Sequence, residues 1–319
     1  MAVYVNTNYS ALQGQRYLGN VQNQLTTTYQ RLSSGMRINS AKDDAAGLQI
    51  ADRLTSQING LNQGNRNASD GIALAQTMEA GMDEISGMLQ KIRTLAVQAN
   101  NGTNTADDRT AISKEMSSLA TEVNRIAMKT TFAGKTVLNG KVNGSIYGDL
   151  AAPGGGANNK LHGDAGTMTL QVGSNKGDTI SFDLASVMFS AIGTGDLIKN
   201  QDAVFKTAND GSITVDLNKA DAANATKSIG AVIDLMDTMI SKVDGMRADL
   251  GAIQNRLESS IRNQSNVAAN EADARSRIRD ADFAEESANL SQQSIIQQAA
   301  ASMLMQANTR PQLGLSLLG

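Results

Sequence analysis

The residues of this sequence that could do chemistry are few and scattered. His162 is the only histidine, there is no cysteine, and the patterns HExxH, GxxxxGK[ST] and GxSxG are absent. A metal site or an acid–base pair needs partners at a defined spacing, and none is visible around His162 in the Gly-rich stretch KLHGDAG. The sequence therefore predicts no catalytic residue, no cofactor and no metal site, and it disfavours an enzyme.

Adjacent charged residues have a more ordinary explanation. The pairs Asp43–Asp44 and Asp107–Asp108 could suggest a cation site, but each precedes a predicted helix, where carboxylates cap free amides and oppose the helix dipole. Arg275, Arg277 and Arg279 could bind phosphate. They alternate with carboxylates, which favours local ion pairs at a joint between helices; these carboxylates are Asp273, Asp280 and Asp282.

The composition excludes several classes of protein. A net charge of −3 argues against strong attraction to nucleic acid or an anionic membrane. The chain is 40% hydrophobic but only 3% aromatic, with no Trp, which favours an elongated helical protein over a compact core built on aromatic side chains. The first 20 residues lack the basic and apolar regions of a secretory signal peptide.

The elements that must position these residues fall into three zones. Residues 1 to about 140 and 221–319 carry apolar residues at helical and heptad spacing. These residues are Leu18, Val21, Leu25, Leu32, Leu54, Ile58, Leu61, Ala68, Ile72, Ala75, Met82, Ile85, Leu89, Ile92, Ala96, Ile112, Met116, Leu119, Val123, Ile126, Met239, Val243, Met246, Leu250, Ile253 and Leu257. The segment SSG, ending at Gly35, interrupts the first helix.

Helix starts are predicted at two further places. Ser40 with Asp43, and Asp282 with Glu285, have the spacing of a capping box ahead of an apolar run. The middle zone, 141 to about 220, instead alternates apolar and polar residues in MTLQV, ISFDL and ITVDL, as half-buried strands do. It also contains a loop signal at Pro153–Gly156. We therefore expect a small, mostly β insert.

The two ends of the chain share an unusual lack of charge. Residues 287–309 carry no charged side chain, and Arg16 is the only charge in residues 1–30. Twelve of those 23 C-terminal residues are Ser, Asn, Gln or Thr, which a helix facing lipid would not carry. A helix face without charge meets protein rather than water. We expect the terminal helices to pack on each other, with the insert at the far end of a hairpin-like rod.

Several long motifs point to a family. The segments RLSSGMRINSAKDDAAGLQIADRL, LQKIRTLAVQANNGTNTADDR and SRIRDADFAEE, with the ending QANTRPQLGLSLLG, closely resemble bacterial flagellin. The likeness covers roughly residues 1–140 and 225–319, with the motifs in the family's order. The likeness does not extend to the middle, residues 141–220, as expected where flagellins vary in length.

The resemblance implies a mainly α fold with a long antiparallel coiled-coil rod made by the N- and C-terminal regions. Residues 1–46 and 277–319 would form the two halves of an inner core domain with its linkers. Residues 47–140 and 221–276 would form the helical rod domain, and residues 141–220 a variable, β-rich outer domain.

The implied function is that of a structural subunit which polymerises into the bacterial flagellar filament for swimming. It would be exported unfolded by the flagellar type III system to the extracellular filament. Its partners would be further copies of itself, the filament cap, the hook–filament junction proteins and an export chaperone, with no nucleic acid and no membrane. A hook–filament junction protein is one alternative, disfavoured because AKDDAAGL and RIRDADF are whole; an enzyme with a metalloprotease-type insert is another, disfavoured because HExxH is absent.

The resemblance also implies two sets of site residues. Animal Toll-like receptor five would contact the rod at Lys91, Arg93, Leu95, Gln98, Glu115 and Arg256. Filament assembly would use Leu18, Leu25, Leu32, Leu290, Ile296, Ala300, Met303 and Leu304. We further expect the terminal helices to order only on assembly, the variant Ala300→Asp to abolish filaments without affecting the monomer, and residues 150–215 to be dispensable for polymerisation.

Overall fold

The computed structural model describes residues 7–142, 144–147, 165–193, 204–208, 211–219 and 228–316. These residues divide between two compact units. The first comprises Met1–Asn59 and Asn266–Gly319, and the second comprises Gly60–Ser265. Both boundaries fall inside long helices, α2 (Ala45–Ala99) and α6 (Ile229–Arg279). The proposed functional division at residues 46 and 277 stays a prediction.

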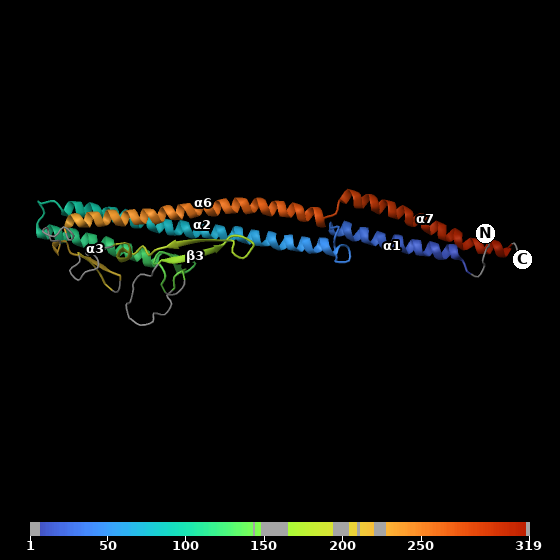
Figure 1. Ribbon diagram of the computed structural model, residues 1–319, viewed down its shortest axis with the longest axis horizontal. Helices are drawn as coiled ribbons and strands as arrows, with labels where there is room; N and C mark the ends of the chain where they lie inside the picture. The colour runs from blue at the N-terminus through green and yellow to red at the C-terminus, as the bar shows by residue number, and fades with distance from the viewer. Residues whose placement is uncertain are drawn as a thin grey trace. The chain divides into compact units, whose positions relative to one another are not determined.

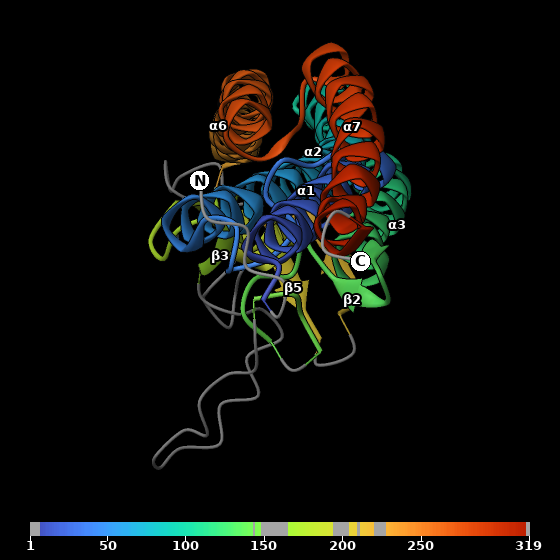
Figure 2. The same cartoon turned by 90° about the vertical axis from the view of Figure 1, so that its right-hand side faces the viewer.

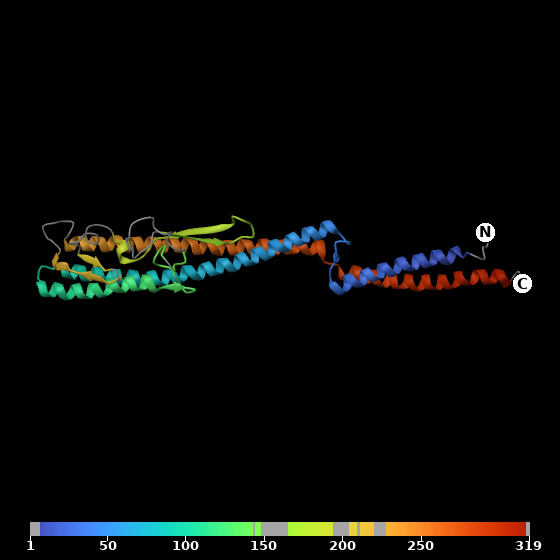
Figure 3. The same cartoon turned by 90° about the horizontal axis from the view of Figure 1, so that it is seen from below.

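The two ends of the chain pair with each other in the first unit. Helix α1 (Tyr9–Ser34) lies antiparallel beside α7 (Phe283–Ser316), as Figures 1 and 3 show, and Figure 2 looks along the pair from the end that carries both termini. The side-chain amide of Asn8 donates to the carbonyl of Ala307 at 2.8 Å, across 299 positions of sequence. The predicted packing of the terminal segments on each other is confirmed.

Local chemistry sets the ends of these helices. Helix α1 ends at Gly35, which adopts a left-handed conformation (φ 69°), as the SSG interruption predicted. Helix α2 begins after Asp44, whose carboxylate accepts the Gly47 amide at 2.9 Å. The predicted capping box at Ser40 is therefore misplaced: the Asp43 carboxylate instead closes a turn by accepting the Ser40 amide at 2.9 Å. Asp44 caps the helix alone, because Gly47 three residues on has no side chain to complete a box, and a search for the box pattern therefore passes over it.

The connections that follow α1 and α6 are joined by backbone hydrogen bonds. The amides of Arg37 and Ala281 donate to the carbonyls of Arg279 (2.7 Å) and Gly35 (2.9 Å), so the two connections form a short antiparallel bridge. Asp282 then starts α7 by accepting the Ala284 amide at 2.9 Å. The predicted helix start at Asp282 is confirmed.

The second unit is built on α2, α3 (Ala106–Lys129) and α6. Most of the apolar residues predicted to form the seams are buried here, among them Leu89, Ile92, Met116, Val243 and Leu257, all of which are fully enclosed. Helix α6 lies antiparallel to α2, since Asp237 pairs with Arg93 while Gln254 pairs with Glu79. The mainly α fold is confirmed.

Among the described residues, this unit also contains three antiparallel hairpins and two short helices; the first hairpin follows α3 directly, and the others belong to the insert. The strand pairs are β1 (Thr131–Phe132) with β2 (Lys135–Thr136), β3 (Gly166–Gln171) with β4 (Thr179–Leu184), and β5 (Phe205–Thr207) with β6 (Ile213–Val215). Helix α4 (Phe189–Ile192) and the 3-10 helix η1 (Leu217–Lys219) complete it. The three predicted strands correspond to β3, β4 and β6. His162 and Pro153–Gly156 lie outside the described residues.

The β3–β4 hairpin lies along the side of α2, not beyond its end. Two glycines of α2 make this approach possible: a Cβ added at Gly64 would come within 2.0 Å of the Val172 carbonyl oxygen, and one at Gly71 within 2.4 Å of Leu170. The insert also completes the core, because Phe182, Phe189, Phe205 and Val215 pack into the same cluster as Met116. The expectation that residues 150–215 are dispensable for polymerisation stays a prediction, and a deletion would remove these side chains from the core.

Candidate functional site: the exposed face of α1 and α7

Within the described residues there is no group of three or more His, Cys, Asp or Glu side chains placed to hold a metal ion. The same part of the chain contains no helix long and apolar enough to cross a bilayer. The feature that stands out is a surface. Eight of the eleven large hydrophobic side chains that the described residues expose lie on α1 and α7: Tyr9, Leu12, Tyr17, Tyr29, Phe283, Ile295, Met303 and Met305.

The distribution of this apolar surface is uneven. Two more of the eleven, Ile50 and Val267, lie elsewhere in the first unit, and among the described residues only Val97 represents the second. Met303 is 73% exposed and Met305 70% exposed. A single exposed Leu or Met is normal on a soluble protein, but a gathering of this kind on one helix pair marks an interaction surface.

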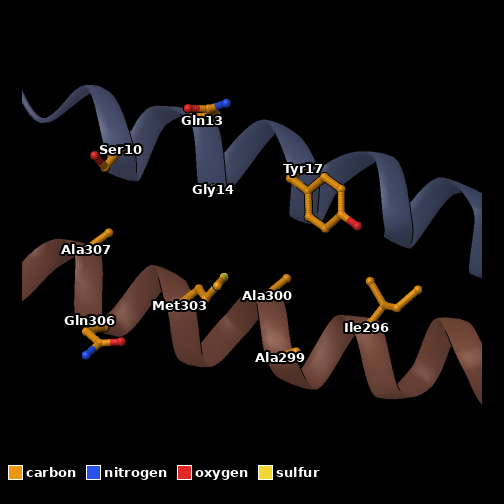
Figure 4. A pocket seen from close by; sticks show the side chains of 10 residues that line it. All are labelled: Ser10, Gln13, Gly14, Tyr17, Ile296, Ala299, Ala300, Met303, Gln306 and Ala307. Atoms are coloured by element: carbon orange, nitrogen blue, oxygen red, sulfur yellow. The ribbon is translucent and has the colours of Figure 1, made fainter.

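A groove runs between the two helices (Figure 4). Its volume is 650 Å³, and it is lined by Ser10, Gln13, Gly14, Tyr17, Ile296, Ala299, Ala300, Met303, Gln306 and Ala307. Tyr17 points from α1 toward α7, and Ile296 and Met303 point from α7 toward α1 (Figure 4). The lining contains no charged residue, so apolar contacts and amide hydrogen bonds are what it offers a partner.

Small residues let the helices approach at this groove. A Cβ added at Gly14 would lie 3.2 Å from Cδ1 of Leu304, tighter than ordinary van der Waals contact. Ala300 is only 6% exposed, because it faces α1. A carboxylate at position 300 would therefore disturb the α1–α7 pair itself. The expectation that Ala300→Asp leaves the monomer untouched stays a prediction, and the burial of Ala300 makes the α1–α7 pair the place to test it.

A few polar contacts fix how the two helices align. The Thr28 hydroxyl donates to Oε1 of Gln293 at 3.1 Å, and Nη1 of Arg31 donates to Oε1 of Glu286 at 3.1 Å. The Glu286 side chain is only 10% exposed. Removing one partner of a buried ion pair is costly, so such pairs oppose sliding of one helix along the other.

The predicted assembly residues lie on this pair of helices with different exposure. Ala300 is buried, Met303 is exposed, and the others are half-buried: Leu18, Leu25, Leu32, Leu290, Ile296 and Leu304. Half-burial means that α1 and α7 leave part of each side chain uncovered. Sequence reasoning missed the exposed residues beside the stripe, such as Ile295 and Met305. The signal in the sequence that could have indicated them was the run of three consecutive apolar residues MLM at 303–305.

The predicted receptor residues are only partly brought together. Nζ of Lys91 lies 3.2 Å from Oε1 of Glu115, and this ion pair joins α2 to α3. Arg93 forms a two-pronged ion pair with Asp237, and this hydrogen bonding lowers the pKa of Asp237 and raises that of Arg93. Leu95 is buried, at 8% exposure, and Gln98 is exposed.

Arg256 lies apart from this cluster. It follows Gln254, whose side chain contacts Glu79, whereas the cluster meets α6 at Asp237. At 1.5 Å per helical residue, Arg256 is roughly 28 Å along α6 from Asp237. A single small contact therefore could not include it.

The remaining charged motifs have structural roles. Thr105 and Asp108 form a reciprocal capping box at the start of α3, and the backbone hydrogen bond from Thr105 lowers the pKa of Asp108. Arg277 pairs with Asp273 at 2.9 Å, and Arg275 donates to the Thr55 hydroxyl at 3.3 Å. Capping at Asp44 and Asp108, and local pairing at Arg277, are confirmed.

Comparisons with known proteins agree with this architecture. Residues 5–143 match the bacterial flagellin N-terminal helical region, and residues 233–318 match the C-terminal helical region. The chain is 37% identical to Flagellin A of Vibrio cholerae serotype O1 over 384 residues, and 37% identical to Flagellin D of Vibrio anguillarum over 377 residues. Each comparison covers 100% of both chains.

A solved structure extends the comparison to the fold. That of a putative flagellar hook-associated protein from Vibrio parahaemolyticus has a TM-score of 0.54 and 16% identity. The likeness covers 75% of this chain and 100% of that one. At this identity it concerns the fold alone.

Proposed function

Because this chain belongs to the bacterial flagellin family, we propose that it is a subunit of the flagellar filament whose copies assemble through the exposed face of α1 and α7. The observation that carries the proposal is that ten of the eleven exposed large hydrophobic side chains among the described residues lie in the first unit. Fully burying a side chain such as Ile295 or Met303 is worth about 1.5–3 kcal/mol. Several such side chains per subunit would drive association.

The scarcity of charge in residues 1–30, where Arg16 stands alone, and its absence from residues 287–309 support the same role. An unpaired charge is expensive in an interior made of neighbouring subunits. Gln, Ser and Asn can instead satisfy their hydrogen bonds in pairs or toward water. The exposed face of α1 and α7 is therefore suited to contact with further copies of the same surface, with its apolar side chains shielded from water and its amides and hydroxyls paired.

A hook–filament junction protein is the less supported alternative. Such a protein would share the terminal helices, and the hook-associated neighbour shares the fold. However, AKDDAAGL and RIRDADF are whole in this chain. The relatives that match over the full length are named flagellins.

The wider biology of the chain belongs to the same proposal. We place the protein in the extracellular filament that drives swimming, reached by unfolded export through the flagellar type III system. Its further partners would be the filament cap, the junction proteins and an export chaperone. The absence of cysteine and of disulfides suits a chain that passes through export unfolded.

The test is a pair of matched substitutions at exposed apolar positions. Met303→Asp places a charge on the proposed assembly face, whereas Val97→Asp places the same charge on the second unit, where the side chain is 49% exposed. We expect Met303→Asp to abolish seeded filament growth in electron microscopy, and Val97→Asp to preserve it. Thermal unfolding of both monomers should match the parent, because neither side chain is buried. Normal filaments from Met303→Asp would refute the proposed surface.

Receptor recognition is a separate part of the proposal. We expect Arg93→Glu to weaken signalling through Toll-like receptor five by the monomer. Because the substitution also removes the pair with Asp237, the control is the double variant Arg93→Glu with Asp237→Arg, which restores an ion pair in reverse. If both variants signal like the parent, the receptor does not use this cluster.

A further inference from the structure

The turn between α2 and α3 contains a residue pair whose reactivity the proposed function does not use. Asn–Gly occurs four times in the sequence, beginning at Asn59, Asn101, Asn139 and Asn143. The backbone nitrogen that follows an asparagine can attack its side-chain carbonyl. Glycine hinders this attack least, because it has no Cβ. The surroundings of each pair then decide whether the attack occurs.

Two of these pairs are protected by the fold. Asn59 and Gly60 lie inside α2, whose hydrogen bonds hold the Gly60 amide, and a Cβ added at Gly60 would lie 2.7 Å from Ser174. Asn139 is only 8% exposed, and Gly140 is fixed in a left-handed conformation (φ 70°). Asn143 lies outside the described residues.

The pair Asn101–Gly102 has none of this protection. Both residues are exposed, and within the described part of the chain the Gly102 amide donates no hydrogen bond. An added Cβ at Gly102 would meet no atom within 4 Å, so the main chain is open to solvent there. The Thr103 amide lies 3.5 Å from Oδ1 of Asn101. The side-chain amide of Asn101 therefore lies folded back beside the main chain that follows it.

We propose that Asn101 is a site of spontaneous deamidation and isomerisation, with water as the only co-reactant. The Gly102 nitrogen loses its proton to a solvent base and attacks Cγ of Asn101. The new N–C bond forms as the bond to the side-chain nitrogen breaks, and that nitrogen leaves as ammonia. Water then opens the resulting cyclic imide: cleavage at Cγ yields aspartate, and cleavage at the main-chain carbonyl yields isoaspartate.

The product would change the turn in two ways. It adds a negative charge where an exposed amide stood, and isoaspartate inserts one extra carbon into the main chain. The turn is held by the Asn104 amide donating to the Asn101 carbonyl at 3.2 Å and by the Asn104 side chain donating to the Gln98 carbonyl at 2.6 Å. A lengthened main chain at Asn101 would break this geometry. The buried Ala99 and the capping box at Thr105 confine the effect to the turn.

The test compares the sites within one molecule. The full chain is incubated at mildly alkaline pH and digested with trypsin, which separates the described sites into peptides 94–109, 54–66 and 136–141. We expect mass spectrometry to show modification at Asn101 more than about tenfold faster than at Asn59 or Asn139, since local opening must precede reaction at those two. In concentrated urea the three rates should converge. Equal rates in the folded chain would overturn the proposal.

A conservative variant separates this chemistry from ordinary hydrolysis. Gly102→Ala should fold unchanged, because its Cβ meets open space and the φ of Gly102 is not in the left-handed region. It should nevertheless slow modification at Asn101, because the Cβ hinders the attacking nitrogen. Undiminished modification in Gly102→Ala, or a product containing aspartate without isoaspartate, would mean that no cyclic imide forms.

Discussion

At the scale of single residues, Tyr147 shows how the insert is tied to α2. Its hydroxyl donates to the Val137 carbonyl at 2.9 Å and lies 3.4 Å from the Met78 sulfur, and the residue is only 8% exposed. We expect Tyr147→Phe to cost about 1–3 kcal/mol near neutral pH, because the Val137 carbonyl is left buried without this donor. Thermal unfolding followed by circular dichroism would measure the loss.

The same tyrosine predicts a dependence on pH. Burial raises the pKa of Tyr147, so the folded state favours the neutral phenol. Its contribution to stability is therefore complete below the ordinary tyrosine pKa of about 10 and is lost as the pH rises above that value. The parent should lose stability there faster than Tyr147→Phe, and the difference between them should narrow. The other tyrosines are common to both chains and cancel. A difference that stays constant into the alkaline range would contradict this account.

At the scale of elements, a row of hydroxyls on α3 completes the edge of β6. The amides of Ile213, Val215 and Leu217 donate to the hydroxyls of Thr121 (3.0 Å), Ser117 (2.8 Å) and Ser113 (3.2 Å), respectively. The amide of Asp216, between Val215 and Leu217, points the other way and donates to the carbonyl of Val204 beside β5. The strand is thus bonded on one side to another strand and on the other side to helical side chains. This ladder is how the insert docks without exposing a free edge.

The ladder predicts different effects for neighbouring serines. Ser117→Ala should destabilise the second unit by about 1–3 kcal/mol, because the Val215 amide loses its acceptor. Ser118→Ala is the matched control: this exposed hydroxyl donates only to the Lys114 carbonyl of its own helix, at 3.1 Å, and its loss should stay within about 0.5 kcal/mol. Urea unfolding gives both values, and equal midpoints for the two variants would show that the ladder carries no stability.

These elements also show what could be predicted from the sequence. The seams through Leu89, Ile92 and Met116 could be predicted because helical periodicity reports burial directly. Strand β5 was missed because three residues, FKT, are too short to alternate. The ladder was missed for another reason: Ser117 and Val215 are 98 positions apart, and helical hydroxyls carry no periodic signal of a partner in a strand.

The candidate site was predicted in the same uneven way. The lack of charge at residues 287–309 pointed to the proposed assembly surface, because charge depletion is visible in composition. The burial of Ala300 and the separation of Arg256 from Arg93 were not predictable. Both depend on how two helices align along their length, and a heptad pattern, which repeats every two turns, does not fix that alignment.

At the scale of the whole molecule, the two units differ in how much they bury. Along α1 and the described side chains of α7, only Val21, Thr28, Glu286 and Ala300 are buried. The second unit, in contrast, holds one continuous hydrophobic core. Backbone ordering costs about 1–2 kcal/mol per residue, and a helix pair with so little burial opens readily. We therefore predict that α1 and α7 are only marginally ordered in the monomer and become fully ordered when further copies of the chain cover them.

Hydrogen exchange in the monomer measures this difference. We expect amides of α1 and α7 to exchange much faster than those of α3, which lies on the core and serves as the internal reference. Assembly should then slow exchange in α1 and α7 more than in α3. Terminal helices as protected in the monomer as α3, or resistant to protease beyond residue 285, would contradict the prediction.

The pairing of Asn8 with Ala307, and of Arg31 with Glu286, has a consequence for the order of events during synthesis. These contacts span 299 and 255 positions, so α1 leaves the ribosome long before its partner exists. Closing so large a loop delays folding, and contacts of this separation form late. Helix α6 likewise follows α2 by more than a hundred residues. A nascent chain of this design therefore has no complete folding unit until α6 has emerged, and its first helix stays without a partner until α7 follows.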